Sequence, residues 1–410
     1  MVEFTARDRL KLLAGASSLV LSACGGGGGS DAPALPTTVS TPPPPAPIPT
    51  PTPAPVTPPA PVSGAPSPGV LRDTFSNNFN MGVAFSSPQI DDGGPSLDLT
   101  LSQFNAMTPE FELQPSFIAP EEGMFNFERG DRVVDFALEN GMPVRGHSLL
   151  WHEETPDYFL QGSRDDIRQR LETYIGTVME HFRDRIQIWD VVNEATSTDL
   201  FRGDAGVGPD RRTIWYEAVG NADYIDWAFI AARNADPNAL LFLNDFETEE
   251  PRKAGWFRDI IRRLRQRGVP IDGAGHQVHL RLESTAVEVL ASIDAIQNEF
   301  PDMITHVTEM DINMYTDPGT CFESGTNCLP DLGPNPPVEL LQRQAQIYRD
   351  VFAGLVARPF VESVTVWGVT DGDSVANRNP TARFNHPLLF DRNGDVKPAY
   401  LAITDPNYVI

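Results

Sequence analysis

Two glutamates stand beside apolar runs that have the composition of buried strands. Glu194 follows Ile186–Val192, and Glu309 lies inside Ile304–Met310. Cleavage of an acetal between two sugars needs a proton for the leaving oxygen and stabilisation of an oxocarbenium-like carbon, and two carboxylates can supply both. A separation of about 5–5.5 Å would favour retention of configuration, and about 6.5–9.5 Å inversion. Taken alone, a glutamate at a strand end is more often a solvated or ion-paired surface group.

The neighbours of these glutamates favour the catalytic interpretation. Asn193 directly precedes Glu194 and offers an amide that could hold a sugar hydroxyl. Asp311 lies two residues after Glu309, so both side chains point to the same side of a strand. From there Asp311 could orient His279, and His279 could hold Glu309. We therefore expect Glu194 and Glu309 to be catalytic and Asp311 to support them.

Metal chemistry is the alternative use of the histidines. His147 and His152 are five residues apart with Trp151 between them, so they do not form the HExxH pair of a helical zinc site. We therefore expect no catalytic metal.

We expect alternating strands and helices to position these side chains. From Val70 onward, short apolar runs alternate with stretches of helical periodicity, which is typical of repeated strand–helix units. The candidate strands are Met81–Phe85, Phe104–Met107, Pro143–Leu149, Ile186–Val192, Leu240–Leu243, Gly275–His279, Ile304–Met310 and Val361–Trp367. The candidate helices are Arg129–Asn140, Asp165–Phe182, Ile225–Asn234, Lys253–Arg267, Ala286–Phe300 and Leu340–Val356, with Gly141 and Gly268 as helix stops.

Eight such strands predict the α/β class and a (β/α)₈ TIM barrel, in which chemistry gathers at the carboxyl ends of the strands. Six of these ends carry polar or aromatic side chains, which indicates one shared site. They include His147, Trp151, Asn193, Glu194, Asn244, Gln277, His279, Glu309, Asp311 and Trp367. The alternative is an open doubly wound sheet; the GxGxxG that would favour it does not follow the first strand.

The charge of the chain limits its partners. The formal net charge is −25, and the charges before residue 69 cancel, so all of it belongs to residues 69–410. A domain this acidic repels nucleic acid and anionic lipid. We expect no nucleic-acid partner; a neutral polysaccharide fits.

Of the three cysteines, Cys24 lies alone near the N-terminus and the other two lie close together. Cys321 and Cys328 lie seven apart in a segment rich in Gly, Pro, Asn and Asp. In an oxidising compartment they would form a small disulfide staple, and the alternative is two free thiols.

The N-terminus has the features of an export signal. Arg7, Arg9 and Lys11 precede an apolar stretch that is too short to span a bilayer permanently. It ends in Leu21-Ser22-Ala23-Cys24, which resembles the bacterial lipobox. The resemblance implies cleavage before Cys24 and a lipid anchor on that cysteine; an ordinary secretory signal is the alternative. Either interpretation exports the protein, to a bacterial envelope membrane, to the cell surface or into the medium as a secreted enzyme.

A linker follows the signal. Five glycines come first, and 16 of the 38 prolines then lie between Pro33 and Pro68. Such a segment is extended and could reach roughly 110 Å at about 3.1 Å per residue. We predict a signal peptide over 1–23, a linker over 24–68 and a catalytic domain over 69–410, attached to a membrane only through Cys24 and acting as a monomer.

Several segments together resemble the family 10 glycoside hydrolases, which are mostly xylanases. They occur in the family's order over about residues 75–403: Arg145-Gly146-His147-Ser148-Leu149-Leu150-Trp151-His152, Trp189-Asp190-Val191-Val192-Asn193-Glu194-Ala195, Asn244-Asp245-Phe246, Gly275-His276-Gln277-Val278-His279-Leu280, Val307-Thr308-Glu309-Met310-Asp311-Ile312, Val366-Trp367-Gly368, Pro387-Leu388-Leu389-Phe390-Asp391 and Lys397-Pro398-Ala399-Tyr400. The resemblance implies retention of configuration and no metal or organic cofactor.

It also implies a role for each matching residue. Glu194 corresponds to the acid/base and Glu309 to the nucleophile. The sugar at the cleavage point would be bound by Asn193, His147 and Gln277. His279 with Asp311 would keep the nucleophile ionised and oriented. Trp151 and Trp367 would be aromatic walls of the cleft, although core packing is the alternative for Trp151.

Three places depart from the family. After the second strand the family usually has Glu-Asn-x-Met-Lys, whose Asn and Lys bind the next sugar. Here only Glu110 is kept, with Phe111 in place of the amide and Gln114 in place of the ammonium. After the eighth strand the usual Ser-Trp is Ser374-Val375, and after His152 the frequent Ser-Gln is Glu153-Glu154. Catalysis is expected to be intact and the neighbouring sugar subsite rebuilt.

Three functions remain open on these grounds. The leading one is endo-acting β-1,4-xylanase activity on xylan or xylo-oligosaccharides, with altered subsite affinity. The second is a retaining β-glycosidase for another β-linked glycan or glycoside, motivated by Phe111, Gln114 and Val375. The third is a tethered carbohydrate-binding protein without catalysis, against which both glutamates, Asn193 and His279 argue.

Overall fold

Eight parallel strands close into a barrel. Neighbouring strands pair in the order β1 (Asn80–Phe85), β2 (Ala106–Pro109), β3 (Val144–His147), β4 (Ile186–Asn193), β5 (Leu240–Asp245), β6 (Gly273–His276), β8 (Ile304–Asn313) and β9 (Val361–Val366). The pairing of β9 with β1 closes the circle. The predicted (β/α)₈ barrel is confirmed, and the open sheet is excluded.

The computed structural model describes residues 69–198 and 208–410. The export signal, Cys24 and the linker lie outside the described residues, so they remain predictions. In the part of the chain that the structure describes, no helix combines the length and apolar character needed to cross a membrane.

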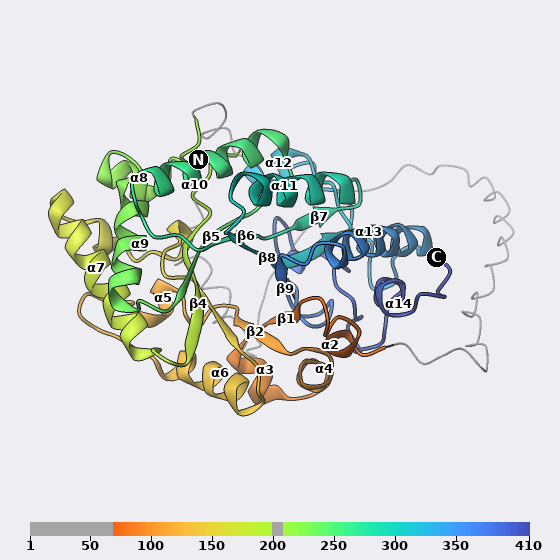
Figure 1. The fold of residues 1–410 in the computed structure, drawn as a ribbon. Coiled ribbons are helices and arrows are strands. Elements are labelled where there is room, and N and C mark those ends of the chain that lie inside the picture. The colour runs from red at the N-terminus through yellow and green to blue at the C-terminus, as the bar shows by residue number, and fades with distance from the viewer. Residues whose placement is uncertain (1–68, 199–207) are drawn as a thin grey trace, which may run out of the picture. The chain divides into compact units, whose positions relative to one another are not determined.

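The helices surround the strands (Figure 1). The six predicted helices are confirmed with shifts of one or two residues as α6 (Glu128–Glu139), α7 (Arg164–His181), α9 (Asp223–Ala235), α10 (Pro251–Gln266), α11 (Ala286–Glu299) and α13 (Val338–Val356). Gly141 and Gly268 adopt left-handed φ angles of 72° and 69°, as expected of residues that end α6 and α10. Shorter elements were not predicted: α2 (Leu71–Thr74), α3 (Ser87–Asp92), α4 (Pro95–Gln103), α5 (Pro115–Ile118), α8 (Ile214–Val219), α12 (Gly319–Ser324), α14 (Pro398–Thr404), η1 (His152–Glu154), η2 (Asp157–Leu160) and η3 (Val375–Asn377).

One strand boundary was wrong in a way that matters for the site. The predicted strand Gly275–His279 is interrupted, because Val278 has a left-handed φ of 61°. The chain continues as β7 (His279–Arg281), which pairs with the end of β8 so that His279 lies opposite Asp311. β8 itself extends three residues beyond the predicted end, to Asn313. The break therefore places His279 beside the strand that carries Glu309.

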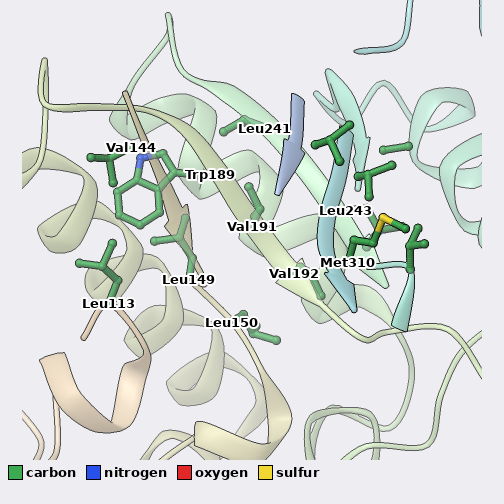
Figure 2. Close-up of a cluster of buried hydrophobic side chains, with 14 of the residues drawn as sticks. Leu113, Val144, Leu149, Leu150, Trp189, Val191, Val192, Leu241, Leu243 and Met310 are labelled. Atoms are coloured by element: carbon green, nitrogen blue, oxygen red, sulfur yellow. The ribbon is translucent and has the colours of Figure 1, made fainter. Parts of the chain in front are cut away.

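Large apolar side chains fill the space around β4. Trp189 is 1% exposed, and Figure 2 shows it together with Val191 and Val192 of the same strand and with Leu241 and Leu243 of β5. Trp189 packs so closely on β3 that a β-carbon on Gly146 would lie 2.2 Å from its ring. Any larger residue at that position would have to displace the Trp189 ring, so the contact requires glycine.

A disulfide joins Cys321 and Cys328. It closes a loop next to α12, in the segment that connects β8 to α13.

Candidate active site

Glu194 lies directly beyond the carboxyl end of β4. Its φ is 59°, an unusual value for a residue with a β-carbon, and its backbone N–H donates to the Asn244 carbonyl at 2.9 Å. The chain therefore turns sharply where the strand ends while its backbone stays bonded to β5. Such strained positions persist where the surroundings hold them, and they concentrate at functional sites.

The surroundings of Glu194 favour its protonated form. Its side chain is mostly buried, and Arg211 Nη1 lies 3.2 Å from Oε2. Burial raises the pKa of Glu194 to about 7, with Glu153 and Asp245 adding to the rise and Arg211 opposing it. A carboxyl group with this pKa can both give and take a proton near neutral pH.

Glu309, on β8, is 5% exposed and accepts two hydrogen bonds. Asn244 Nδ2 donates to Oε1 at 2.7 Å, and His279 Nε2 lies 3.2 Å from Oε2. His147 Nδ1 is 4.0 Å from Oε1. Both carboxylate oxygens are thus oriented by donors, which stabilise the ionised form.

His279 lies between two carboxylates. Its Nδ1 is 3.1 Å from Asp311 Oδ1, on the side away from Glu309. Burial opposes protonation of the ring, but the charges and hydrogen bonds of Asp311 and Glu309 outweigh it and hold the pKa of His279 well above its usual range. His279 is therefore a cation at neutral pH, and both of its nitrogens donate.

A second buried ion pair supports His147. Asp190 accepts from His147 Nδ1 at 3.0 Å and from Arg145 Nε at 2.9 Å, with Arg145 Nη2 as a further donor. Burial opposes ionisation of Asp190, yet Arg145 and His147 hold its pKa below the usual range. Burial also opposes protonation of His147, but Asp190 and Glu309 raise the pKa of its imidazole.

Three amides connect the two glutamates. Gln277 Nε2 lies 3.5 Å from Glu194 Oε1 and 3.2 Å from Asn193 Oδ1. Asn193 Oδ1 also accepts from Asn244 Nδ2 at 3.0 Å, and that same amide group reaches Glu309. Glu194 and Glu309 therefore share one hydrogen-bonded network across strands β4, β5 and β8.

The two tryptophans lie at the rim of this network. Trp151 forms a parallel bridge with Asn193, is half-buried and adjoins Glu194. Trp367 follows β9 and packs edge-on against His147, with ring centroids 5.3 Å apart. Each tryptophan therefore contacts a residue of the site and does not pack only in the interior of the barrel.

Glu110 follows β2 and is buried. Burial, with smaller contributions from Glu112 and Asp373, raises the pKa of Glu110 to about 8. Glu309 acts in the same direction, which links Glu110 to the same site. A carboxyl group in this position is neutral at pH 7 and can donate a hydrogen bond.

One cluster has the spacing of a cation site. Ligand atoms of His152, Glu153 and Glu194 lie within 4.8 Å of one another. Arg211 already brings a positive charge to Glu194, so no metal is needed for neutralisation.

The structure brings together every residue that the sequence pointed to on β3 to β9, and it adds three. Asn244, which the sequence marked only as the polar end of its strand, gains hydrogen bonds to Asn193 and Glu309. Arg211, Arg145 and Asp190 were given no role, because Arg211 comes from a loop without regular periodicity and the other two look like ordinary strand charges. The strand-end position of Asn244 was a usable signal; for Arg211 the sequence holds none.

Comparison with known proteins agrees with this geometry. The family model described as "Glycosyl hydrolase family 10" matches residues 70–406. The chain is 34% identical over 356 residues to the exoglucanase XynX of Acetivibrio thermocellus, with 83% of this chain and 30% of that protein covered. It is 35% identical over 340 residues to a β-1,4-xylanase of Dictyoglomus thermophilum, with 81% and 90% covered. The chain thus spans less than a third of the Acetivibrio protein, but nearly all of the Dictyoglomus enzyme is covered.

Solved structures show the same barrel. Xylanase B from Clostridium stercorarium F9 superposes with a TM-score of 0.74 at 33% identity, covering 82% of this chain and 99% of that one. A mutant protein solved in complex with xylotriose superposes equally well, at 29% identity and with the same coverage. The family match covers most of the chain, and the relatives share about a third of their residues with it: the chain belongs to glycosyl hydrolase family 10.

Proposed function

We propose that this protein is a retaining endo-β-1,4-xylanase in which Glu194 is the acid/base and Glu309 the nucleophile. One observation carries the proposal: two networked carboxyl groups lie in opposite environments. Burial raises the pKa of Glu194 to about 7, whereas two donors stabilise the charge of Glu309. Separating the properties of two carboxyl groups in this way is how one site supplies both an acid and an anion.

In the first step, the protonated Glu194 gives its proton to the glycosidic oxygen. The bond between that oxygen and the anomeric carbon breaks as a Glu309 oxygen attacks the carbon. The leaving chain departs as an alcohol, and an ester joins the sugar to Glu309. His279 and Asn244 hold the attacking carboxylate in place during this step.

In the second step, the ionised Glu194 takes a proton from water, and the water oxygen attacks the anomeric carbon. The ester breaks, Glu309 becomes a carboxylate again, and the product keeps its configuration after two inversions. The pKa of about 7 suits both directions of proton transfer, because it lies near the working pH.

The choice of xylan rests on the relatives. Among the chain's relatives, six are named as β-1,4-xylanases and another as a celloxylanase. One similar structure holds xylotriose. Endo action is proposed on the same grounds, since five of those relatives are named endo-1,4-β-xylanases.

The test is product analysis with the full chain and with Glu309→Ala and Glu194→Gln variants. Linear xylan and mixed-linkage β-glucan are incubated separately, and the anomeric configuration of the first product is followed by proton NMR. We expect β-configured xylo-oligosaccharides from the wild type and none from Glu309→Ala. Release of α-configured product would contradict the retaining mechanism. Cleavage of β-glucan without cleavage of xylan would contradict the substrate.

A further inference from the structure

The loop after β9 carries three arginines in different environments. Arg383 is buried and pairs with Asp317, and Arg392 donates to the Asn385 carbonyl at 3.0 Å. Arg378, by contrast, is exposed. Within residues 69–198 and 208–410, its guanidinium makes no hydrogen bond or ion pair. It is therefore available to a ligand.

The backbone that presents Arg378 is firmly held. Asn377 Nδ2 donates to the carbonyls of Asp371 at 2.7 Å and Ser374 at 2.9 Å. The Arg378 N–H donates to the Val375 carbonyl at 2.9 Å. The side chain thus starts from a fixed point, which reduces the entropy lost when it binds a partner.

Arg378 stands on the same rim of the barrel as Glu110. Strand β1 pairs with β2 on one side, Phe85 opposite Pro109, and with β9 on the other, Val83 opposite Val366. The segments that follow β2 and β9 therefore leave the barrel as near neighbours. The charge of Arg378 reaches Glu110 and opposes the rise that burial causes in its pKa, yet the two groups form no ion pair.

We propose that Arg378 binds the carboxylate of a uronic acid branch on a xylan chain bound beside Glu194 and Glu309. The inference rests on the proposed function and specifies the substrate class for it. Because Arg378 is exposed while Glu110 is buried, it meets a group that projects from the chain rather than a main-chain sugar. A guanidinium offers two parallel donors that match a carboxylate.

Shape and charge support this assignment. Val375, three residues before Arg378, is a small side chain that is 39% exposed, so no large side chain covers that position of the loop. The net charge of −25 repels acidic polysaccharides at long range. A neutral xylan needs no compensation for that repulsion, whereas an acidic branch needs a cation at the point of contact.

The experiment compares two substrates of equal length, a linear xylo-oligosaccharide and one that carries a single glucuronyl branch. The readout is the ratio of kcat/KM on the branched substrate to that on the linear one. We expect Arg378→Gln to lower this ratio by about fivefold, since a partly exposed charge-assisted contact is of that size. Arg378→Lys should keep part of the preference. Salt at about 0.5 M should weaken it in the wild type.

Two controls separate charge from fold. Arg343→Gln removes an exposed arginine from the outer helix α13 and should leave the ratio unchanged. A branch whose carboxylate is reduced to an alcohol should lower the wild-type ratio as much as Arg378→Gln does. An unchanged ratio in Arg378→Gln would overturn the inference while the proposed function stands. Equal losses on both substrates would overturn it as well. If the wild type cleaves neither substrate, the proposed function itself is wrong.

Discussion

His279 Nε2 lies 3.2 Å from Oε2 of Glu309. The contact sets an imidazolium against the proposed nucleophile, because Asp311 on the far side of the ring helps to hold the pKa of His279 well above its usual range against the effect of burial. Charge alternates along this line as carboxylate, cation, carboxylate. The middle group both orients Glu309 and stabilises its charge.

Replacing the cation should therefore impair the nucleophile. His279→Gln keeps a donor but removes the positive charge that faces Glu309. We expect kcat on a linear xylo-oligosaccharide to fall roughly 10- to 100-fold. Asp311→Asn leaves His279 in place and should cause a smaller loss. An unchanged kcat in a folded His279→Gln variant would contradict a charge-stabilising role for His279.

The fall of kcat/KM at high pH should be set by the ionisation of Glu194. The group acts as an acid only while protonated, so kcat/KM should fall above its pKa of about 7. Arg211, at 3.2 Å, opposes the rise that burial causes, and its removal should raise the pKa further. We expect Arg211→Gln to move the basic limb to higher pH in a kcat/KM profile, with circular dichroism as the check on folding. A basic limb that moves to lower pH in this variant would show that another group controls it.

Ionisation of Glu194 should also lower the free energy of unfolding of the domain. Its folded pKa is raised above the unfolded value of 4.5, so the protonated form favours folding. That contribution is complete below pH 4.5 and is lost as the pH rises through about 7. Glu194→Gln keeps the side chain neutral, so this inactive variant should have a higher Tm than the wild type at pH 8 and the same Tm at pH 4. Equal melting temperatures at pH 8 would mean that ionised Glu194 is not destabilising.

The barrel was predictable because its signal repeats. Eight apolar runs separated by amphipathic helices are compatible with few architectures other than a barrel. Gly141 and Gly268 mark where helices α6 and α10 end. The broken strand at Val278 was not predictable, since a valine in a left-handed conformation goes against local preference and is held by tertiary contacts.

The site was predictable to the extent that its residues lie at strand ends. Glu194, Glu309 and His279 stand where parallel strands bring their carboxyl ends together, so their proximity follows from the fold. Arg211 and Arg378 come from loops, whose course depends on contacts far apart in the sequence. Their contributions to Glu194 and Glu110 became visible only in three dimensions.

The disulfide between Cys321 and Cys328 should stabilise the fold without serving catalysis. Closing a loop of this length is worth about 2–3 kcal/mol in the chain-entropy model. We expect Cys321→Ser to lower the Tm measured by calorimetry while kcat on xylan stays within a factor of about two, since neither cysteine touches the network around Glu309. Reduction of the wild type should reproduce the variant's Tm. A large loss of kcat in a folded variant would show that the stapled loop takes part in binding.

The membrane anchor that we infer from Leu21-Ser22-Ala23-Cys24 can be tested separately from catalysis. If Cys24 is lipidated, the full chain expressed in a bacterium should sediment with the membranes and partition into detergent. Cys24→Ser should move the activity to the soluble fraction with kcat unchanged, because the cysteine precedes the catalytic domain. Mass spectrometry of the mature N-terminus would identify the acyl groups. Soluble wild-type enzyme that begins at another residue would favour the ordinary secretory signal.

Glu110 combines the clearest departure from an ordinary carboxyl group with one of the positions at which the sequence departs from the pattern of the resemblance described above. Burial raises its pKa to about 8, and Gln114, which stands where that pattern usually has a lysine, donates from Nε2 to the Glu110 backbone carbonyl at 3.2 Å. At pH 6 the side chain is a neutral donor, so Glu110→Gln should bind linear xylo-oligosaccharides with a KM within about threefold of the wild type, whereas Glu110→Ala should lose roughly 10-fold. Above pH 8 the wild type ionises and its KM should rise, because a carboxylate no longer donates, while the KM of Glu110→Gln should stay level. A wild-type KM that improves above pH 8 would mean that the sugar is held by the charged form of Glu110.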